Sequence, residues 1–127
     1  MGAAFEIQKS INSVLEAGLD VPVYDSVPEN AAYPYVVIGD DTLVDFSTDG
    51  KTGFDATVTI HTWSSFDGMS QVKALMGYVY DLLNRQDYGI NGFNLLGSDS
   101  EFEETFLEAD GVVRHGVQRF RLILIKE

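Results

Sequence analysis

Four aspartates fall close together in one stretch of this 127-residue chain. They are Asp40, Asp41, Asp45 and Asp49. Carboxylate oxygens are the ligands that Ca²⁺ and Mg²⁺ prefer, so these side chains could hold a divalent cation. Their spacing is not that of an EF-hand loop, and no glutamate follows at the position of the bidentate ligand. The pattern favours an acidic surface over a metal site.

Groups that could act as nucleophiles or bases are sparse. The chain has no cysteine, its histidines are His61 and His115, and no serine stands in a Gly-x-Ser-x-Gly elbow. Each histidine is expected to have a structural or surface role. Glu103 and Glu104 could be drawn as an acid–base pair, but adjacent residues of a strand point to opposite faces. The sequence predicts that the chain is not an enzyme and takes no cofactor.

The charge balance restricts the expected partners. There are 20 acidic and 8 basic residues, which give a net charge of −12. Neither a nucleic-acid backbone nor an anionic membrane is expected to bind, because both need lysine and arginine. There is no secretory-signal pattern, and no apolar run approaches the roughly 20 residues that span a bilayer. With 45% apolar residues, residues 1–127 are expected to form one soluble domain.

Residues 3–17 have the periodicity of an amphipathic helix. Its apolar stripe consists of Ile7, Ile11, Val14 and Leu15. Glu6 is expected on the polar side, and Gly18 is placed to end the helix. Residues 19–28 contain two prolines, which favour an extended crossing after the helix.

A second helix is expected to begin within residues 64–68, with Ser65 or Asp67 as its N-cap. Its apolar stripe consists of Val72, Leu75, Met76, Val79, Leu82 and Leu83. Gly77 would permit a close approach of this helix to the sheet. Residues 84–86 would end it.

Alternation of apolar and polar residues predicts the strands. Residues 35–46 and 54–63 would form a long antiparallel hairpin, whose tip contains Asp49-Gly50 as the source of positive φ. Three further strands are expected after the second helix, at 93–96, within 98–110 and at 112–125. The expected fold is α+β: a mainly antiparallel β-sheet with two helices packed on one face and a long protruding β-hairpin.

Four segments resemble a known family in their order and spacing. They are VYDSVP at 23–28, YPYVVIGD at 33–40, VTIHTWS at 58–64 and HGVQRFR at 115–121. With them, nearly the whole chain resembles the tail-terminator, or tail-completion, proteins of long, non-contractile-tailed bacteriophages. The resemblance implies a structural virion protein that caps the tail tube as a hexameric ring. Such a ring ends tube polymerisation and forms the interface to the head–tail connector.

The same resemblance implies a place and partners. The protein would be assembled in the host cytoplasm and lie at the head-proximal end of the virion tail. Its partners would be further copies of itself, the tail tube protein and the connector or neck protein, while DNA passes through without specific binding.

Two sets of residues are candidates for these contacts. The hairpin set, expected to contact a neighbouring subunit or the tube, is Asp40, Asp41, Asp45, Phe46, Asp49, Lys51 and Phe54. The acidic set, expected to line the lumen and repel phosphates, is Asp99, Glu101, Glu103, Glu104 and Glu108.

Other readings of the chain stay open at this point. A neck or head-completion protein is the nearest class that could be confused with a tail terminator. A protein-binding module outside phages, and an enzyme that uses the acidic hairpin with a divalent metal, are the alternatives from other classes.

Overall fold

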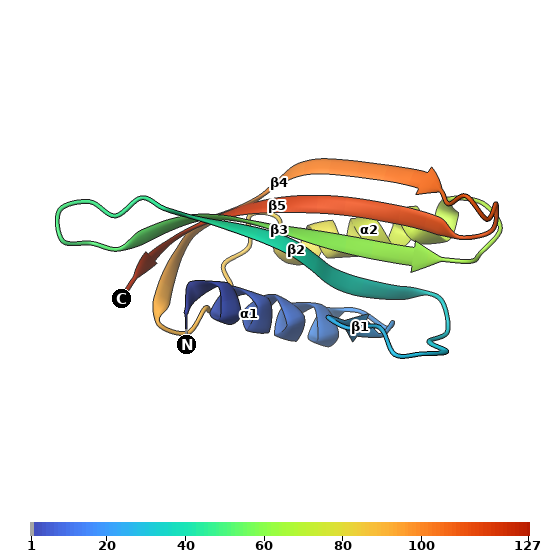
Figure 1. The fold of residues 1–127 in the computed structure, drawn as a ribbon, viewed down its shortest axis with the longest axis horizontal. Helices are drawn as coiled ribbons and strands as arrows, with labels where there is room; N and C mark the ends of the chain where they lie inside the picture. The colour runs from blue at the N-terminus through green and yellow to red at the C-terminus, as the bar shows by residue number, and fades with distance from the viewer. Residues whose placement is uncertain (1) are drawn as a thin grey trace.

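A five-stranded sheet with both helices on one face forms the fold (Figure 1). The structure is a computed structural model and describes residues 2–127. The elements in chain order are α1 (Ala3–Gly18), β1 (Val23–Tyr24), β2 (Tyr35–Asp45), β3 (Gly53–Ser64), α2 (Ser70–Leu83), β4 (Phe93–Leu107) and β5 (Arg114–Lys126). The α+β class expected from the sequence is confirmed.

The strand order across the sheet is β1-β2-β3-β5-β4. The short β1 pairs parallel with β2, and all other pairs are antiparallel. The last strand, β5, lies between β3 and β4, so the α2 connection from β3 to β4 passes over it. The register places Trp63 opposite His115 and Thr59 opposite Arg119. This topology makes β4 an outer strand of the sheet.

The core lies between the helices and the two central strands. Alternate residues of β3 and β5 point toward the helices and are buried. They include Val58, Ile60, Phe120, Leu122 and Leu124. From the helices, Ile11, Leu15, Val79 and Leu83 are fully buried against them. Each such side chain contributes about 1.5–3 kcal/mol on burial, so the alternation of the two central strands holds both helices.

Helix α1 agrees with its expected bounds but differs in the position of one charge. The helix ends at Gly18, and the Leu19 N–H donates to the Leu15 carbonyl. Glu6, expected on the polar side, is buried. It lies in the first turn and lines a pocket together with Phe54 and Phe93. Neither helix of residues 2–127 is long and apolar enough to cross a membrane.

Helix α2 begins later than the sequence predicts. It starts at Ser70 after an N-cap at Met69 without a side-chain hydrogen bond, so the predicted caps Ser65 and Asp67 are wrong. Gly68 has φ +100°, a conformation outside the helical region, which delays the helix. The predicted apolar stripe is buried apart from Leu82, which is partly buried. Gly77 does not approach the sheet, since a Cβ added there meets nothing within 4 Å.

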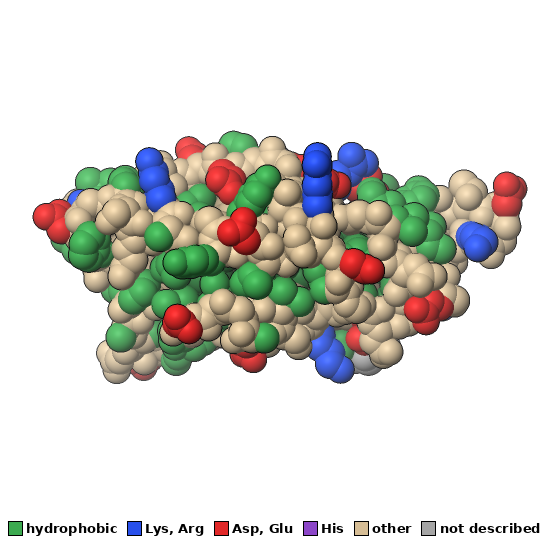
Figure 2. Space-filling view, turned by 180° about the vertical axis from the view of Figure 1, so that it is seen from behind, with side chains coloured by type: hydrophobic (Ala, Val, Ile, Leu, Met, Phe, Trp, Pro, Cys, Tyr) green, Lys and Arg blue, Asp and Glu red, His purple; other side chains and the backbone are tan. Residues whose placement is uncertain are grey.

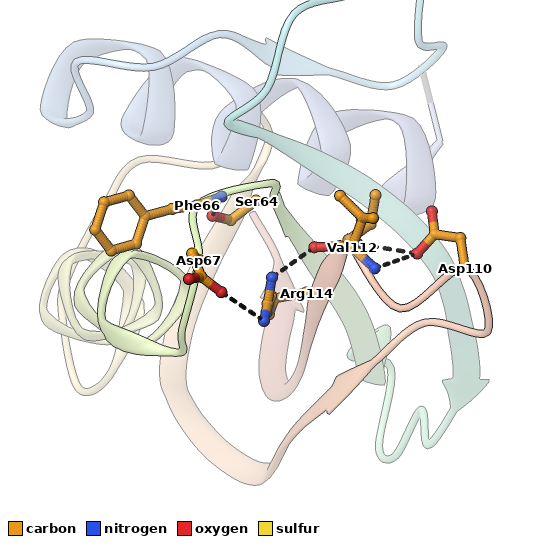
Figure 3. A network of polar contacts seen from close by, with 7 residues as sticks. Ser64, Phe66, Asp67, Asp110, Val112 and Arg114 are labelled. Atoms are coloured by element: carbon orange, nitrogen blue, oxygen red, sulfur yellow. Dashed lines mark hydrogen bonds and ion pairs between the residues drawn. The ribbon is translucent and has the colours of Figure 1, made fainter.

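A hydrogen bond joins the loop before α2 to the start of β5, and local hydrogen bonds order the loop and the β4–β5 turn (Figure 3). Arg114 donates to Asp67 at 3.4 Å and to the Val112 carbonyl at 2.8 Å. Asp110 accepts the Val112 N–H at 2.8 Å, which orders the turn. Ser64 accepts the Phe66 N–H at 3.1 Å. Asp67 therefore contacts the start of β5 instead of capping the helix.

The chain after α2 forms one long strand where the sequence predicts two. β4 runs unbroken through 93–96 and most of 98–110, with irregularities between Leu95 and Gly97 and between Ser100 and Phe102. Each bulge shifts the alternation of side chains, so the pattern reads as separate pieces. Ser98, between the bulges, is buried and donates to the Leu83 carbonyl at 2.8 Å. This contact fixes β4 to the end of α2.

Phe120 is the largest fully buried side chain and therefore the best test of the core. We expect Phe120→Ala to lower the free energy of unfolding by about 3–5 kcal/mol, because burial is lost and a cavity remains. Leu96→Ala, at a site that is 64% exposed, should change it by about 0.5 kcal/mol or less. Urea unfolding followed by circular dichroism measures both. Equal costs for the two variants would contradict this description of the core.

Candidate functional site

The hairpin between β2 and β3 extends beyond the helices at one end of the molecule (Figure 1). Thr48 and Lys51 exchange both backbone hydrogen bonds, at 2.9 and 2.7 Å. Between them Asp49 has φ +45° and Gly50 has φ +79°, so the positive φ expected at this dipeptide is confirmed. All residues from 40 to 51 are exposed. The tight turn therefore closes a solvent-exposed arm, which consists of residues 40–51 and the phenylalanines beside them.

The hairpin set divides into exposed charges and two phenylalanines with different surroundings. Asp40, Asp41, Asp45, Asp49 and Lys51 are exposed along the arm. Phe46 is 39% exposed and lies over Gly53, where an added Cβ would come 2.7 Å from its ring. Phe54 is half-buried and packs edge-on against Phe93 at the margin of the core. Phe46 is the member of the pair that the arm can offer to a partner.

The acidic set is distributed along β4 and the turn after it. The sheet face turned away from the helices is called the open face below, and Asp99, Glu101 and Glu104 lie on it or at its edge. Glu103 lies on the helix side, and Glu108 follows the end of the strand. Arginines accompany two of them: Glu101 lies 3.0 Å from Arg119, and Asp99 lies 3.4 Å from Arg85. Glu103 and Glu104 point to opposite faces, because they oppose Gln118 and Val117.

A further arginine pairs with an acidic residue on the central strands of the open face. Arg121 of β5 contacts both carboxylate oxygens of Asp55 on β3 through two donors. This hydrogen bonding lowers the pKa of Asp55 and raises that of Arg121. The Arg119 guanidinium also lies 5.3 Å from the centre of the Phe102 ring. The charged side chains in the middle of the open face are thus paired, and their charges nearly cancel. The aspartates outside these pairs lie toward the arm.

Aromatic rings gather on the open face at the end opposite the arm. Trp63 stacks on His115 with ring centres 3.7 Å apart, and Phe106 lies 4.8 Å from the same imidazole. Tyr33 and Tyr35 stack beside them at 5.2 Å. An open groove of about 400 Å³, called the aromatic groove below, is lined by Val27, Tyr33, Tyr35, Val37, His61 and Trp63.

The two histidines form a chain of hydrogen bonds that ends on a carboxylate. His115 Nδ1 lies 2.8 Å from Glu108 Oε1, and His115 Nε2 lies 2.7 Å from His61 Nδ1. A carboxylate only accepts, so neutral His115 donates from Nδ1 and accepts from the Nδ1–H of His61. The His61 ring lies against Gly39, where an added Cβ would come 2.6 Å from it. The pair is packed in place, and no serine or cysteine stands at its end.

Burial lowers the pKa of His61, and the adjacent His115 lowers it further, while Asp40 opposes the shift. The sequence did not predict this pairing. Alternation along the strand places His61 and Trp63 on the same face, and this was the one available signal. The position of His115 opposite Trp63 depends on the register between β3 and β5, which cannot be read from the sequence. Across residues 2–127, no group of three or more His, Cys, Asp or Glu side chains could hold a metal ion.

Comparison with known proteins gives a family for this arrangement. Residues 4–125 match the family described as tail completion protein gp17. The chain belongs to this family of tail completion proteins. It is thus a structural protein of phage tails.

Two similar proteins agree with this membership. The tail completion protein gp17 of Bacillus phage SPP1 is 26% identical over 102 residues, which cover 80% of this chain and 75% of that protein. A chain in the virion of a native gene transfer agent (GTA) particle has a TM-score of 0.89 at 22% identity, with 98% of both chains covered. The second likeness shows that this tail completion protein shares its whole fold with a virion component.

The histidine pair gives this tail completion protein an expected pH dependence. The folded state depresses the pKa of His61, so below about pH 6.5 the unfolded chain binds a proton that the folded chain resists. Stability from this source is present above about pH 6.5 and is lost as the pH falls toward the lower, folded-state pKa. Replacing His61 with Gln removes this contribution.

We therefore expect the difference in unfolding free energy between the wild type and His61→Gln to narrow as pH is lowered from about 7.5 to about 5.5. Urea unfolding at constant ionic strength measures it. A difference that stays constant, or widens, would show that His61 is not held neutral in the folded protein.

Proposed function

We propose that this tail completion protein caps the tail tube as a hexameric ring. The ring ends tube polymerisation and forms the interface to the head–tail connector. The observation that carries the proposal is the family match over residues 4–125, nearly the whole chain. The protein would be assembled in the host cytoplasm and sit at the head-proximal end of the virion tail.

The shape of the subunit supports assembly by unlike surfaces. The arm projects from one end of the molecule (Figure 1). The aromatic groove lies on the open face toward the other end. Contacts between different surfaces of successive copies close into a ring when the rotation between copies allows it. The exposed side chains of Leu43, Val44 and Phe46 give the arm apolar area to bury in such a contact or against the tube.

The charge of the subunit supports a path for DNA through the ring without specific binding. Each copy carries a net charge of −12. We place carboxylates of the arm and of the acidic set toward the lumen, where they repel the phosphates of passing DNA. The arginines near β5 pair with Asp55 and Glu101, so they offer little free positive charge to a nucleic acid.

Repulsion between acidic copies gives the proposal a salt dependence. We expect ring formation to strengthen as ionic strength rises from about 0.05 to about 0.5 M, because salt screens charges beyond about 10 Å. Light scattering across the salt series measures assembly, and negative-stain electron microscopy at the highest salt identifies its symmetry. Six-fold rings are the expected particles.

Two results would count against this assembly. Rings that dissociate as salt is added would show that attraction between opposite charges, not apolar contact, holds the copies together. A monomer at every salt and protein concentration, both alone and with tube protein, would remove the ring from the proposal.

A further inference from the structure

The outer edge of β4 is open over much of its length. β4 pairs with β5, and within residues 2–127 no strand pairs with its other side. The end of α2 closes this edge at one place, where the Arg85 N–H donates to the Ser98 carbonyl at 2.6 Å and Asn84 Oδ1 accepts the Ser100 N–H at 2.9 Å. From Glu101 to Leu107 the edge presents backbone groups to solvent, which is a template for one more strand.

A groove follows this open edge, between β4 and α2. Its volume is about 490 Å³. One stripe of α2 forms its helical wall, at positions i, i+3, i+4 and i+7: Lys73, Met76, Gly77 and Tyr80. The strand wall consists of Glu103, Glu104 and Thr105. Hydrophobic side chains gather along the middle of the side seen in Figure 2, with acidic side chains beside them.

A buried amide sets the spacing of the two walls. Gln118 is fully buried on β5, and its Nε2 donates to the Met76 carbonyl and to Glu103 Oε1, both at 2.9 Å. The helix and the edge strand are thus tied to one side chain from opposite sides. These two hydrogen bonds tie the helix to the edge strand beneath the groove.

Gly77 has no role inside the protein that requires glycine. Its φ is not positive, and a Cβ added there meets nothing within 4 Å. Glycine is nonetheless among the least favourable residues for a helix interior. The missing side chain of Gly77 leaves space in the groove beside Tyr80, where an added strand would lie.

Charge selects the occupant of the groove. Its lining carries two carboxylates, Glu103 and Glu104, against one lysine, Lys73, so its net charge is negative and a strand with basic side chains complements it. The arm of a second copy is acidic, and pairing it with β4 would set carboxylates against carboxylates. The arm of a second copy is therefore a poor fit, and a basic segment of a different protein fits the charge of the groove better.

We propose that the open edge of β4 binds an extended, basic segment of another virion protein as an additional strand of the sheet. Backbone hydrogen bonds to residues 101–107 supply affinity, and alternate side chains supply specificity. Small or apolar side chains face Gly77 and Tyr80, and lysine or arginine faces Glu104. The inference rests on the proposed function only where it places the partner in the virion.

A labelled, capped peptide of alternating lysine and valine tests this site by fluorescence anisotropy. We expect Gly77→Leu to weaken binding about tenfold or more by filling the groove, while its thermal midpoint rises by a few degrees because the helix gains a better residue. Ala74→Leu places the same side chain on an exposed position of the same helix outside the groove lining, and should bind like the wild type.

Two control peptides separate strand addition from charge attraction. One replaces valine by proline, which keeps the charge and removes backbone donors, and the other replaces lysine by glutamate. Both should bind much more weakly than the lysine–valine peptide. Equal binding of the proline peptide, equal binding by Gly77→Leu, or no binding to the wild type would overturn the proposal.

The result is separable from that for the ring. Six-fold rings without peptide binding would overturn the groove and leave the capping proposal standing. Peptide binding without rings would leave the groove standing and overturn the capping proposal.

Discussion

One-sided burial of the sheet is the constraint on which the rest of this structure depends. Alternate residues of β3 and β5 pack against α1 and α2, and fully buried side chains such as Ile60 and Phe120 supply the core. With 127 residues the chain covers one face of a sheet that has two. The arm and the aromatic groove lie where the helices do not reach, and the edge of β4 stays open beyond the end of α2.

Electrostatics then distinguishes these exposed regions from one another. On the middle of the open face, Arg119 and Arg121 are held by Glu101 and Asp55, so that area is close to balanced. The carboxylates of the arm, and Glu104 at the free edge of β4, lie outside these ion pairs. Where titratable groups do meet, at His61 and His115, one hydrogen bond joins the two rings and Trp63 stacks on His115. For the proposed ring, this distribution of charge suits surfaces that contact other virion proteins.

Local patterns were sufficient to predict much of this fold from the sequence. The stripe of α1, the alternation of β3 and β5, and the Asp49-Gly50 turn each depend on neighbours along the chain, and the structure confirms them. The family was also recognisable from short segments in order. What failed depends on distant partners. The start of α2 is delayed by the positive φ of Gly68, while Asp67 contacts Arg114 far along the chain, and β4 was divided because bulges interrupt its alternation.

The candidate site was less accessible for the same reason. The exposure of the arm followed from its composition, but the contact of His61 with His115 required the β3–β5 register. The groove beside β4 required the placement of α2, and Gly77 was expected at the sheet rather than at an open wall.

Electron cryo-microscopy of the tailed particle that contains this chain tests the capping role most directly. The account predicts a six-fold ring of this fold at the head-proximal end of the tail tube, with carboxylates toward the lumen. Density for the fold elsewhere in the particle, or a pore lined by lysine and arginine, would contradict it.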